Sequence, residues 1–226
     1  MPRFLFFLFA LLPWTSGLSG PVPPDLASAL KEFRAEGSRG WSFTQTTSSG
    51  EKSLVEHFDP LKPDYARWTL LKKDGKDPSP DDIKSYQEKF TRRSRGDTAP
   101  NVKDQLNLST CEVVSENAER GVYRFHLNPG GSEDKSAQFM VATFTLHRPT
   151  HTIEIVELAS VEPFSPVFAV KVEEARTIMH YSLPEGDRPT LLQEITVRVR
   201  GRAMWLKSLD EDMRVSYSDY VYAGKK

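Results

Sequence analysis

The second half of the chain constrains the fold most strongly, because it consists almost entirely of strand-like segments joined by short turns. From residue 105 to residue 222, β-branched and aromatic residues alternate with polar ones, and clusters of Gly, Pro, Asp and Asn separate the segments. Short turns join antiparallel strands, whereas parallel strands need a crossover of about a dozen residues or more. The pattern therefore predicts a meander of neighbouring antiparallel strands.

Two of these segments are apolar on both faces. In residues 137–146, Phe139 and Val141 alternate with a second apolar set, and residues 167–172, which include Phe168, repeat the pattern. An antiparallel sheet with one solvated face alternates more cleanly. We therefore expect helices to cover the inner face of a curved sheet, or that face to surround a cavity.

The first half of the chain predicts two helices. Residues 23–37 form an amphipathic pattern with Asp25 as the expected N-cap and Gly37 as the stop signal. Residues 79–95 form a second such pattern, which begins at the expected N-cap Ser79 and ends in arginines that suit the C-terminal end of the helix dipole.

Between these helices, residues 41–58 are typical of a hairpin and residues 66–73 of a third strand. We therefore expect a mostly β (α+β) fold, in which a strongly curved antiparallel sheet or incomplete barrel of about ten strands has two or so helices over its concave face. A closed barrel satisfies the same demands, and Gly201 is expected to mark a bend. Residues 20–226 are long enough for one sizeable core and short for two, so we expect one domain.

The N-terminus predicts a secretory signal peptide over residues 1–19. One Arg precedes an apolar run over residues 4–14, and small residues follow with Gly17 and Ser19 spaced for signal peptidase. The run is shorter than the roughly 20 residues of a spanning helix, although an uncleaved anchor is the alternative. We expect a soluble periplasmic protein without stable membrane insertion, in which the single cysteine, Cys111, is a small buried residue.

Charge and motifs exclude several classes of function. The 30 Lys and Arg residues balance 31 Asp and Glu residues, so no basic field predicts a nucleic-acid partner. The sequence holds no phosphate-binding, dinucleotide-binding or nucleophile-elbow motif, and no cofactor is expected. We expect the protein to be a monomer.

The five histidines offer weak candidates for chemistry. His147 and His151 have the spacing of metal ligands on a helix, but Pro149 places them at a hairpin turn, so we interpret them as turn residues. His57 and Asp59 have the spacing of an acid/base pair, although a solvated strand end is the simpler reading. No residue is nominated as catalytic, and we expect a protein that is not an enzyme.

Aromatic residues are spread along the predicted sheet, and most of them are expected to form ordinary core. About ten strands and two short helices nevertheless leave much concave surface, so a residual apolar hollow is expected. An acyl chain would gain about 0.8 kcal/mol for each CH2 that it buries there. The sequence does not show which face of each strand points inward. The predicted wall positions are Trp41, Phe43, Trp68, Leu70, Phe139, Val141 and Phe168.

A short part of the sequence resembles a known family. Ser-Phe-Thr-Gln at residues 42–45, the following hairpin, Lys62-Pro63 and Arg67-Trp68 are similar to the N-terminal third of the periplasmic lipoprotein carrier LolA and its relatives, which include the outer-membrane receptor LolB. The resemblance is specific over residues 42–71, and the later strands agree in order and length. It implies an incompletely closed barrel with a helical lid over an apolar cavity for lipoprotein acyl chains.

The resemblance also implies a role for two basic residues. In the carrier, an Arg directly before the Pro holds the lid closed through backbone carbonyls, whereas this chain has Lys62, a point charge without a planar fork. Lys62 and Arg67 are the residues that the resemblance implies as lid or head-group contacts.

Three hypotheses about function follow. The first is a periplasmic carrier or binding protein for an acyl-bearing ligand, either a lipid or a lipoprotein. The second is an envelope sensor or interaction domain that binds another protein on the same fold, with residues 92–95 as its contact surface. The third is a hydrolase, which requires at least two of His57, Asp59, His126 and His180 to converge in one cleft.

Overall fold

The computed structural model describes residues 20–35, 39–93, 102–129, 136–204 and 207–224. The predicted signal peptide and Gly37 lie outside these ranges. The helices are α1 (Pro24–Glu32) and α2 (Pro80–Arg93). The strands are β1 (Trp41–Ser49), β2 (Lys52–Phe58), β3 (Trp68–Lys73), β4 (Glu112–Glu116), β5 (Arg120–His126), β6 (Met140–His147), β7 (Thr152–Ser160), β8 (Val170–Tyr181), β9 (Leu192–Ala203), β10 (Lys207–Ser208) and β11 (Glu211–Tyr222).

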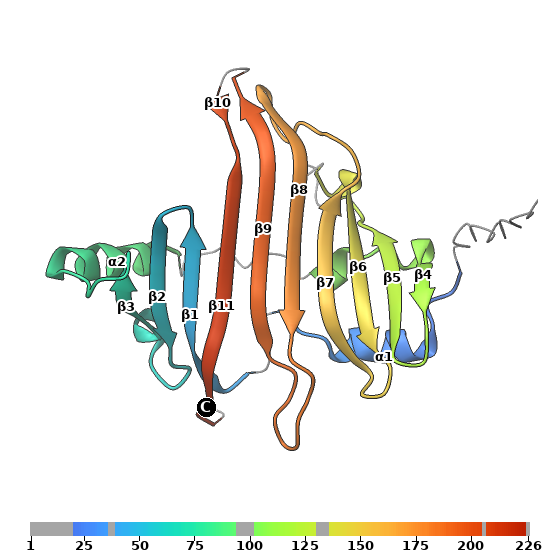
Figure 1. Cartoon of the computed structure of the whole chain (residues 1–226), viewed down its shortest axis with the longest axis horizontal. Helices are drawn as coiled ribbons and strands as arrows, with labels where there is room; N and C mark the ends of the chain where they lie inside the picture. Colours follow the sequence, from blue (N-terminus) through green and yellow to red (C-terminus); the bar gives the residue numbers. More distant parts are fainter. Residues whose placement is uncertain (1–19, 36–38, 94–101, 130–135, 205–206, 225–226) are drawn as a thin grey trace, which may run out of the picture.

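All of these strands belong to one sheet that does not close. Their order is β3-β2-β1-β11-β9-β8-β7-β6-β5-β4, with β10 paired to β9, and every pairing is antiparallel. Figure 1 shows the sheet face-on, with β3 and β4 at its two edges. The predicted mostly β fold with an antiparallel, incompletely closed sheet is confirmed, and the closed barrel is not formed.

The pairing of β1 with β11 joins the two ends of the chain. The meander from β4 to β9 continues into β11, and the N-terminal strands β1, β2 and β3 extend the sheet beyond it. Trp41 lies opposite Tyr222, so residues at the two ends of the sequence become neighbours. This long-range pairing places the first hairpin beside the C-terminal strand.

Gly201 lies at a close approach between β8 and β9. A Cβ on this glycine would come within 2.5 Å of the Lys171 carbonyl oxygen, which no side chain tolerates. The register between these strands shifts between Val172 and Glu174 at the same place. A β-bulge of this kind bends the strand, and the bend predicted at Gly201 coincides with it.

Helix α1 packs over the β5–β8 part of the sheet. Phe33 lies edge-on to Phe144 of β6 and to Tyr181 of β8, with ring centroids 6.1 and 5.3 Å away. The same core takes in Cys111, which is buried as predicted, and burial raises the pKa of its thiol. The buried side chains that pack with α1 share one face of the sheet and are Tyr123, Phe125, Ala142, Phe144, Leu146, Ile153, Val156, Met179, Tyr181 and Leu192.

The predicted N-cap of α1 is wrong. The helix begins at Pro24, and Pro23 occupies the N-cap position without a side-chain hydrogen bond. Two consecutive prolines preset the backbone for a helix start and remove N–H groups that a cap would otherwise satisfy. Asp25 therefore lies within the first turn, where its carboxylate accepts a hydrogen bond from the Leu26 N–H at 2.9 Å.

The start of α2 agrees with the prediction. The Asp82 N–H donates to the Ser79 Oγ at 3.2 Å, and the Ser79 N–H donates to the Asp82 carboxylate at 3.1 Å. This reciprocal arrangement is a capping box. The Lys73 ammonium lies 2.5 Å from the Asp82 carboxylate, which fastens the start of α2 to β3. Together with Ser79, this contact lowers the pKa of Asp82 to about 2.

Both helices lie on the concave face. The Tyr86 hydroxyl of α2 donates to Glu56 of β2, and Glu56 points to the same face as Phe58, two residues further along the strand. Phe58 lines a hollow together with Phe33, the last core residue at the end of α1. Within the described residues, no helix is both long enough and apolar enough to cross a membrane.

Leu26 tests the contribution of α1. Its side chain is completely buried, so we expect Leu26→Ala to lower the free energy of unfolding by about 2–5 kcal/mol through the cavity that it leaves. Leu108 is exposed, and Leu108→Ala is the matched control, for which we expect a change within about 0.5 kcal/mol. Urea unfolding followed by circular dichroism measures both. Equal effects of the two variants would contradict the packing described for α1.

Candidate functional site

A row of aromatic side chains crosses the concave face at the N-terminal edge of the sheet. Phe43 of β1 lies directly opposite Phe58 of β2, which lies opposite Trp68 of β3. The ring centroids are 5.0 Å apart for Phe43 and Phe58, 5.0 Å for Phe58 and Trp68, and 5.7 Å for Phe43 and Trp68. Cross-strand registration thus produces a continuous aromatic wall.

Strand β11 extends this wall through a bulge. Ser42 pairs with Val221 and Thr44 with Ser218, so the single residue Phe43 faces two residues of β11. Asp219 takes the extra place with a positive φ of 54°, and Tyr220 turns to the concave face. The Phe43 ring consequently lies 5.5 Å from that of Tyr220.

A hollow of about 1180 Å³ lies between this aromatic wall and the end of α1. Its lining comes from segments far apart in the sequence, namely α1, the starts of β1 and β3, the turn before β7 and the β8–β9 connection. Such a volume is slightly above the range of about 300–1,000 Å³ that is usual for ligand sites in proteins. Its apolar walls are formed by Ala29, Phe33, Trp41, Phe43, Phe58, Trp68, Ile153 and Tyr181.

Charged groups also line the hollow. Arg34 and Arg39 follow α1, Arg67 precedes β3, and Glu32 is the acidic residue among the lining side chains. Within the described part of the chain, no ion pair joins Arg34 or Arg39 to another residue. Sequence reasoning missed these two arginines, because nothing in the sequence shows that the end of α1 faces the first hairpin.

Arg67 and Lys62 are held in the turn before β3. The Arg67 Nε donates to the Lys62 carbonyl at 3.2 Å, and its guanidinium lies 2.9 Å from the Asp64 carboxylate. The Lys62 ammonium lies 4.0 Å from Asp59 and does not line the hollow. Arg67 lines the hollow, and its predicted contact with a lid or head group stays a prediction, whereas Lys62 lies outside the lining and supports the turn through its carbonyl.

Three of the predicted wall residues line the hollow, and the other four do not. Trp41, Phe43 and Trp68 are part of its wall. Leu70 is buried on the same concave face, opposite Glu56, but away from the hollow.

The predictions for Phe139, Val141 and Phe168 are wrong. Phe139 stacks on Phe164 at 5.4 Å, away from the hollow. Val141 is buried on the convex side of β6, because the neighbouring Ala142 faces the core under α1. Phe168 is 96% exposed in the connection before β8. The alternating pattern showed two apolar faces, but it did not say which face was concave.

A buried polar cluster beside the wall was not predicted. Glu56 is only 7% exposed, and its carboxylate accepts hydrogen bonds from the Tyr86 hydroxyl at 2.7 Å and the Gln45 amide at 3.1 Å. Burial and then the hydrogen bond to Glu56 raise the pKa of Tyr86 well above its usual range, and burial and then the Glu56 charge raise the pKa of Tyr217 to about 12. The hydrogen bond between Tyr86 and Glu56 joins α2 to β2. Leaving the buried Glu56 carboxylate without this donor would cost free energy of folding.

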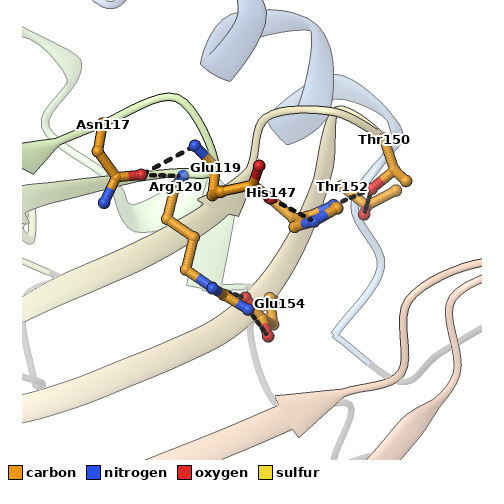
Figure 2. Close-up of polar contacts among 7 residues, drawn as sticks. All are labelled: Asn117, Glu119, Arg120, His147, Thr150, Thr152 and Glu154. Carbon is orange, nitrogen blue, oxygen red and sulfur yellow. Dashed lines mark hydrogen bonds and ion pairs between the residues drawn. The ribbon is translucent and has the colours of Figure 1, made fainter.

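His147 belongs to a hydrogen-bonded network in the turn between β6 and β7 (Figure 2), and His151 of the same turn lines the hollow. The His147 Nδ1 lies 2.7 Å from the Thr150 hydroxyl, and Arg120 makes two hydrogen bonds to Glu154, at 2.7 and 3.1 Å. The Arg120 guanidinium lowers the pKa of the Glu154 carboxyl. Among the described residues, no group of His, Cys, Asp and Glu side chains is arranged to hold a metal ion.

The residues that a hydrolase would need do not converge. His57 is on β2, His180 is on β8 and His126 is on β5. Three strands lie between β2 and β8, and two between β8 and β5. The Asp59 carboxylate accepts a hydrogen bond from the Leu61 N–H at 3.0 Å, so it stabilises its own turn. The cleft that this hypothesis required is not assembled from these side chains.

Comparisons with known proteins give no family. No family model matches the chain, and no curated protein does. Among solved structures, the chain is similar to GphF dehydratase 1 with 11% identity, 88% coverage of this chain, 82% of that chain and a TM-score of 0.20. An isomerase-inactive variant of GphF DH1 has 12% identity, coverages of 89% and 80%, and a TM-score of 0.20. At such TM-scores these likenesses carry no argument.

The half-buried phenols of Tyr86 and Tyr217 predict a loss of stability in alkali. Their folded-state pKa values lie above the unfolded value of 10.0, so their contribution is complete below pH 10 and is lost as the pH rises through the folded-state pKa, which is about 12 for Tyr217 and higher for Tyr86. We expect Tyr86→Phe to lower the free energy of unfolding at pH 7 by about 1–3 kcal/mol, since Glu56 loses a donor. We also expect this variant to lose less stability than the parent chain between pH 7 and about pH 11.

Urea unfolding at the two pH values measures this prediction. Tyr65 is exposed, so Tyr65→Phe is the matched control and should leave both the stability at pH 7 and its alkaline decrease unchanged. An alkaline decrease of the same size in Tyr86→Phe and the parent chain would show that burial of this phenol is not its cause.

Proposed function

We propose that the chain binds an acyl-bearing amphiphile, either a lipid or a lipidated protein, in the hollow between the aromatic wall and α1. The observation that carries this proposal is the combination of an aromatic-walled hollow of about 1180 Å³ with arginines among its lining residues. An apolar chain with a charged or polar head has both of the chemical features that this lining complements.

The walls suit an acyl chain. Trp41, Phe43, Phe58 and Trp68 are all half-buried, although large aromatic side chains gain most from complete burial. An acyl chain against their faces would remove both its own CH2 groups and the rings from water, at about 0.8 kcal/mol for each CH2. The aromatic wall thus supplies the affinity in this proposal.

The arginines suit an anionic head group. The planar guanidinium groups of Arg34 and Arg39 can donate two parallel hydrogen bonds to a carboxylate or phosphate. Arg67 is already neutralised by Asp64 at 2.9 Å, so Arg34 and Arg39 are the stronger candidates for the head group. The placement of these two residues at the end of α1 also links head-group binding to the helix that covers the core.

The sequence resemblance to the periplasmic lipoprotein carriers implies an acyl-bearing ligand, and the apolar lining of the hollow suits the same class of ligand. Trp68 and Arg67, on which the resemblance depends, both line the hollow. A carrier of this kind would act in the periplasm after removal of residues 1–19, as a protein without enzymatic activity, and would hold the acyl part away from water during transfer. An envelope protein that supplies or receives the ligand is a further expectation of the proposal.

The direct experiment is mass spectrometry of compounds extracted from protein purified without detergent. We expect a fatty acid, phospholipid or lipopeptide in stoichiometric amount. The proposal fails if the purified protein carries no acyl compound and binds none in fluorescence displacement assays. Recovery of one envelope protein in a pull-down, with no acyl compound bound, would instead favour the interaction-domain hypothesis.

Trp68 tests the wall. We expect Trp68→Ala to weaken binding of a long-chain fatty acid about tenfold or more, because it removes a large apolar contact surface from the hollow. Tyr65→Ala, which truncates an exposed aromatic residue in the preceding turn, is the matched control and should bind as the parent chain does. Urea unfolding of both variants separates lost affinity from lost folding, and equal fatty-acid affinity of Trp68→Ala and the parent chain would contradict the wall assignment.

Arg34 and Arg39 test the head group. We expect Arg34→Gln and Arg39→Gln each to weaken fatty-acid binding about tenfold, since a hydrogen bond to a charged group contributes about 1.5–3 kcal/mol. Binding of the uncharged alcohol of the same chain length should not change. Arg176, which pairs with Glu157 at 2.9 Å away from the hollow, gives the control Arg176→Gln. Equal losses for acid and alcohol would show that these arginines shape the fold rather than recognise charge.

A further inference from the structure

A small group of apolar side chains is exposed at the end of the sheet opposite the hollow. We call Val167, Phe168 and Met204 the apolar tip; they are 61%, 96% and 72% exposed. The tip precedes β8, whereas Tyr181, which lines the hollow, ends it. The 12 residues of this strand place the two sites about 35–40 Å apart at about 3.3 Å per residue.

The tip is a hydrogen-bonded structure that holds Phe168 outward. The Met204 N–H donates to the Ala169 carbonyl at 2.7 Å, and the Val170 N–H donates to the Val167 carbonyl at 3.2 Å. Ala169 and Met204 both have left-handed backbones, with φ of 65° and 49°. Figure 1 shows that β10 and the adjoining ends of β8 and β9 project beyond the other strands. The chain thus adopts an uncommon backbone where it exposes a large aromatic side chain.

Cationic side chains lie beside the tip. Lys171 of β8 and Arg202 of β9 lie opposite each other, and Lys207 of β10 lies opposite Ala203. The Glu173 carboxylate is 3.5 Å from the Arg202 guanidinium and offsets its charge. Lys171 and Lys207 are exposed, and no ion pair joins either of them to another described residue, so their charges can meet an external anion.

We propose that the apolar tip is a peripheral membrane-docking site, in which Phe168 and Met204 enter the interfacial region of an anionic lipid bilayer and Lys171 and Lys207 contact its head groups. Exposed apolar side chains beside unpaired lysines are the pattern of side chains that bind reversibly at such an interface. The hollow is not part of this site, and the proposal does not rest on the function proposed for the hollow.

The size and shape of the tip favour a lipid surface over a protein partner. A stable protein interface needs about 800 Å² on each side and good shape complementarity, which three side chains on a projecting turn do not supply. A fluid bilayer needs no complementary pocket, and its anionic head groups match the cations beside the tip. A protein partner is therefore one of the outcomes that the experiment must separate.

Sedimentation with lipid vesicles tests the site on the whole chain. We expect binding to vesicles of phosphatidylglycerol and phosphatidylcholine, at least about tenfold weaker binding to phosphatidylcholine alone, and loss of binding in high salt. Phe168→Ala should weaken binding to the anionic vesicles about tenfold, and Lys171→Glu should weaken it at least as much. The apolar N-terminal segment is common to all variants, so differences among them report the tip.

Two matched controls keep the test specific. Tyr65→Ala removes another exposed aromatic side chain, and Lys84→Glu reverses another exposed charge, on α2; both should bind vesicles as the parent chain does. The proposal is overturned if the parent chain does not bind anionic vesicles, or if Phe168→Ala and Lys171→Glu bind them unchanged. Self-association that Phe168→Ala abolishes, seen by analytical ultracentrifugation without vesicle binding, would identify the tip as a protein interface and also overturn it.

Discussion

The pairing of β1 with β11 is the interaction on which the rest of the structure depends. It adds the N-terminal hairpin and β3 to a meander that would otherwise end at the C-terminal strand. It also brings Phe43 against Tyr220 and places the aromatic row of β1, β2 and β3 across from α1. The hollow therefore forms only when the first and last strands have paired, which is a contact between residues far apart in the sequence.

The hollow exists because the two helices together cover only part of the concave face of the sheet. Helix α1 has 9 residues and packs over the β5–β8 part, while α2 is fastened over β2 and β3 through Glu56 and Lys73. A helix of 9 residues is only about 14 Å long, too short to span the concave face between them. The aromatic wall is thus left half-buried in the gap, where a ligand can complete its burial.

The sequence was sufficient for the strand order of the meander, the first hairpin and the capping box of α2, because these depend on neighbouring residues. It also identified Trp41, Phe43 and Trp68, whose positions follow from a local hairpin register. It was insufficient for Val141 and Phe168, since an apolar pattern on both faces does not say which face is concave. Glu56 and Tyr86 could not be paired from sequence, because their contact joins elements whose packing only the folded sheet determines.

The open sheet carries two separate apolar features, one near each end of β8. Its concave end shelters aromatic side chains behind α1, whereas its opposite end exposes Phe168 on a turn with left-handed residues. Simple burial would favour moving Phe168 inward, and the nearby residues Phe164 and Val172, which pair with each other, are indeed buried. Phe168 nevertheless stays exposed on a turn that the hydrogen bond between Met204 and Ala169 joins to the end of β9, so a role at the surface explains the tip better than packing does.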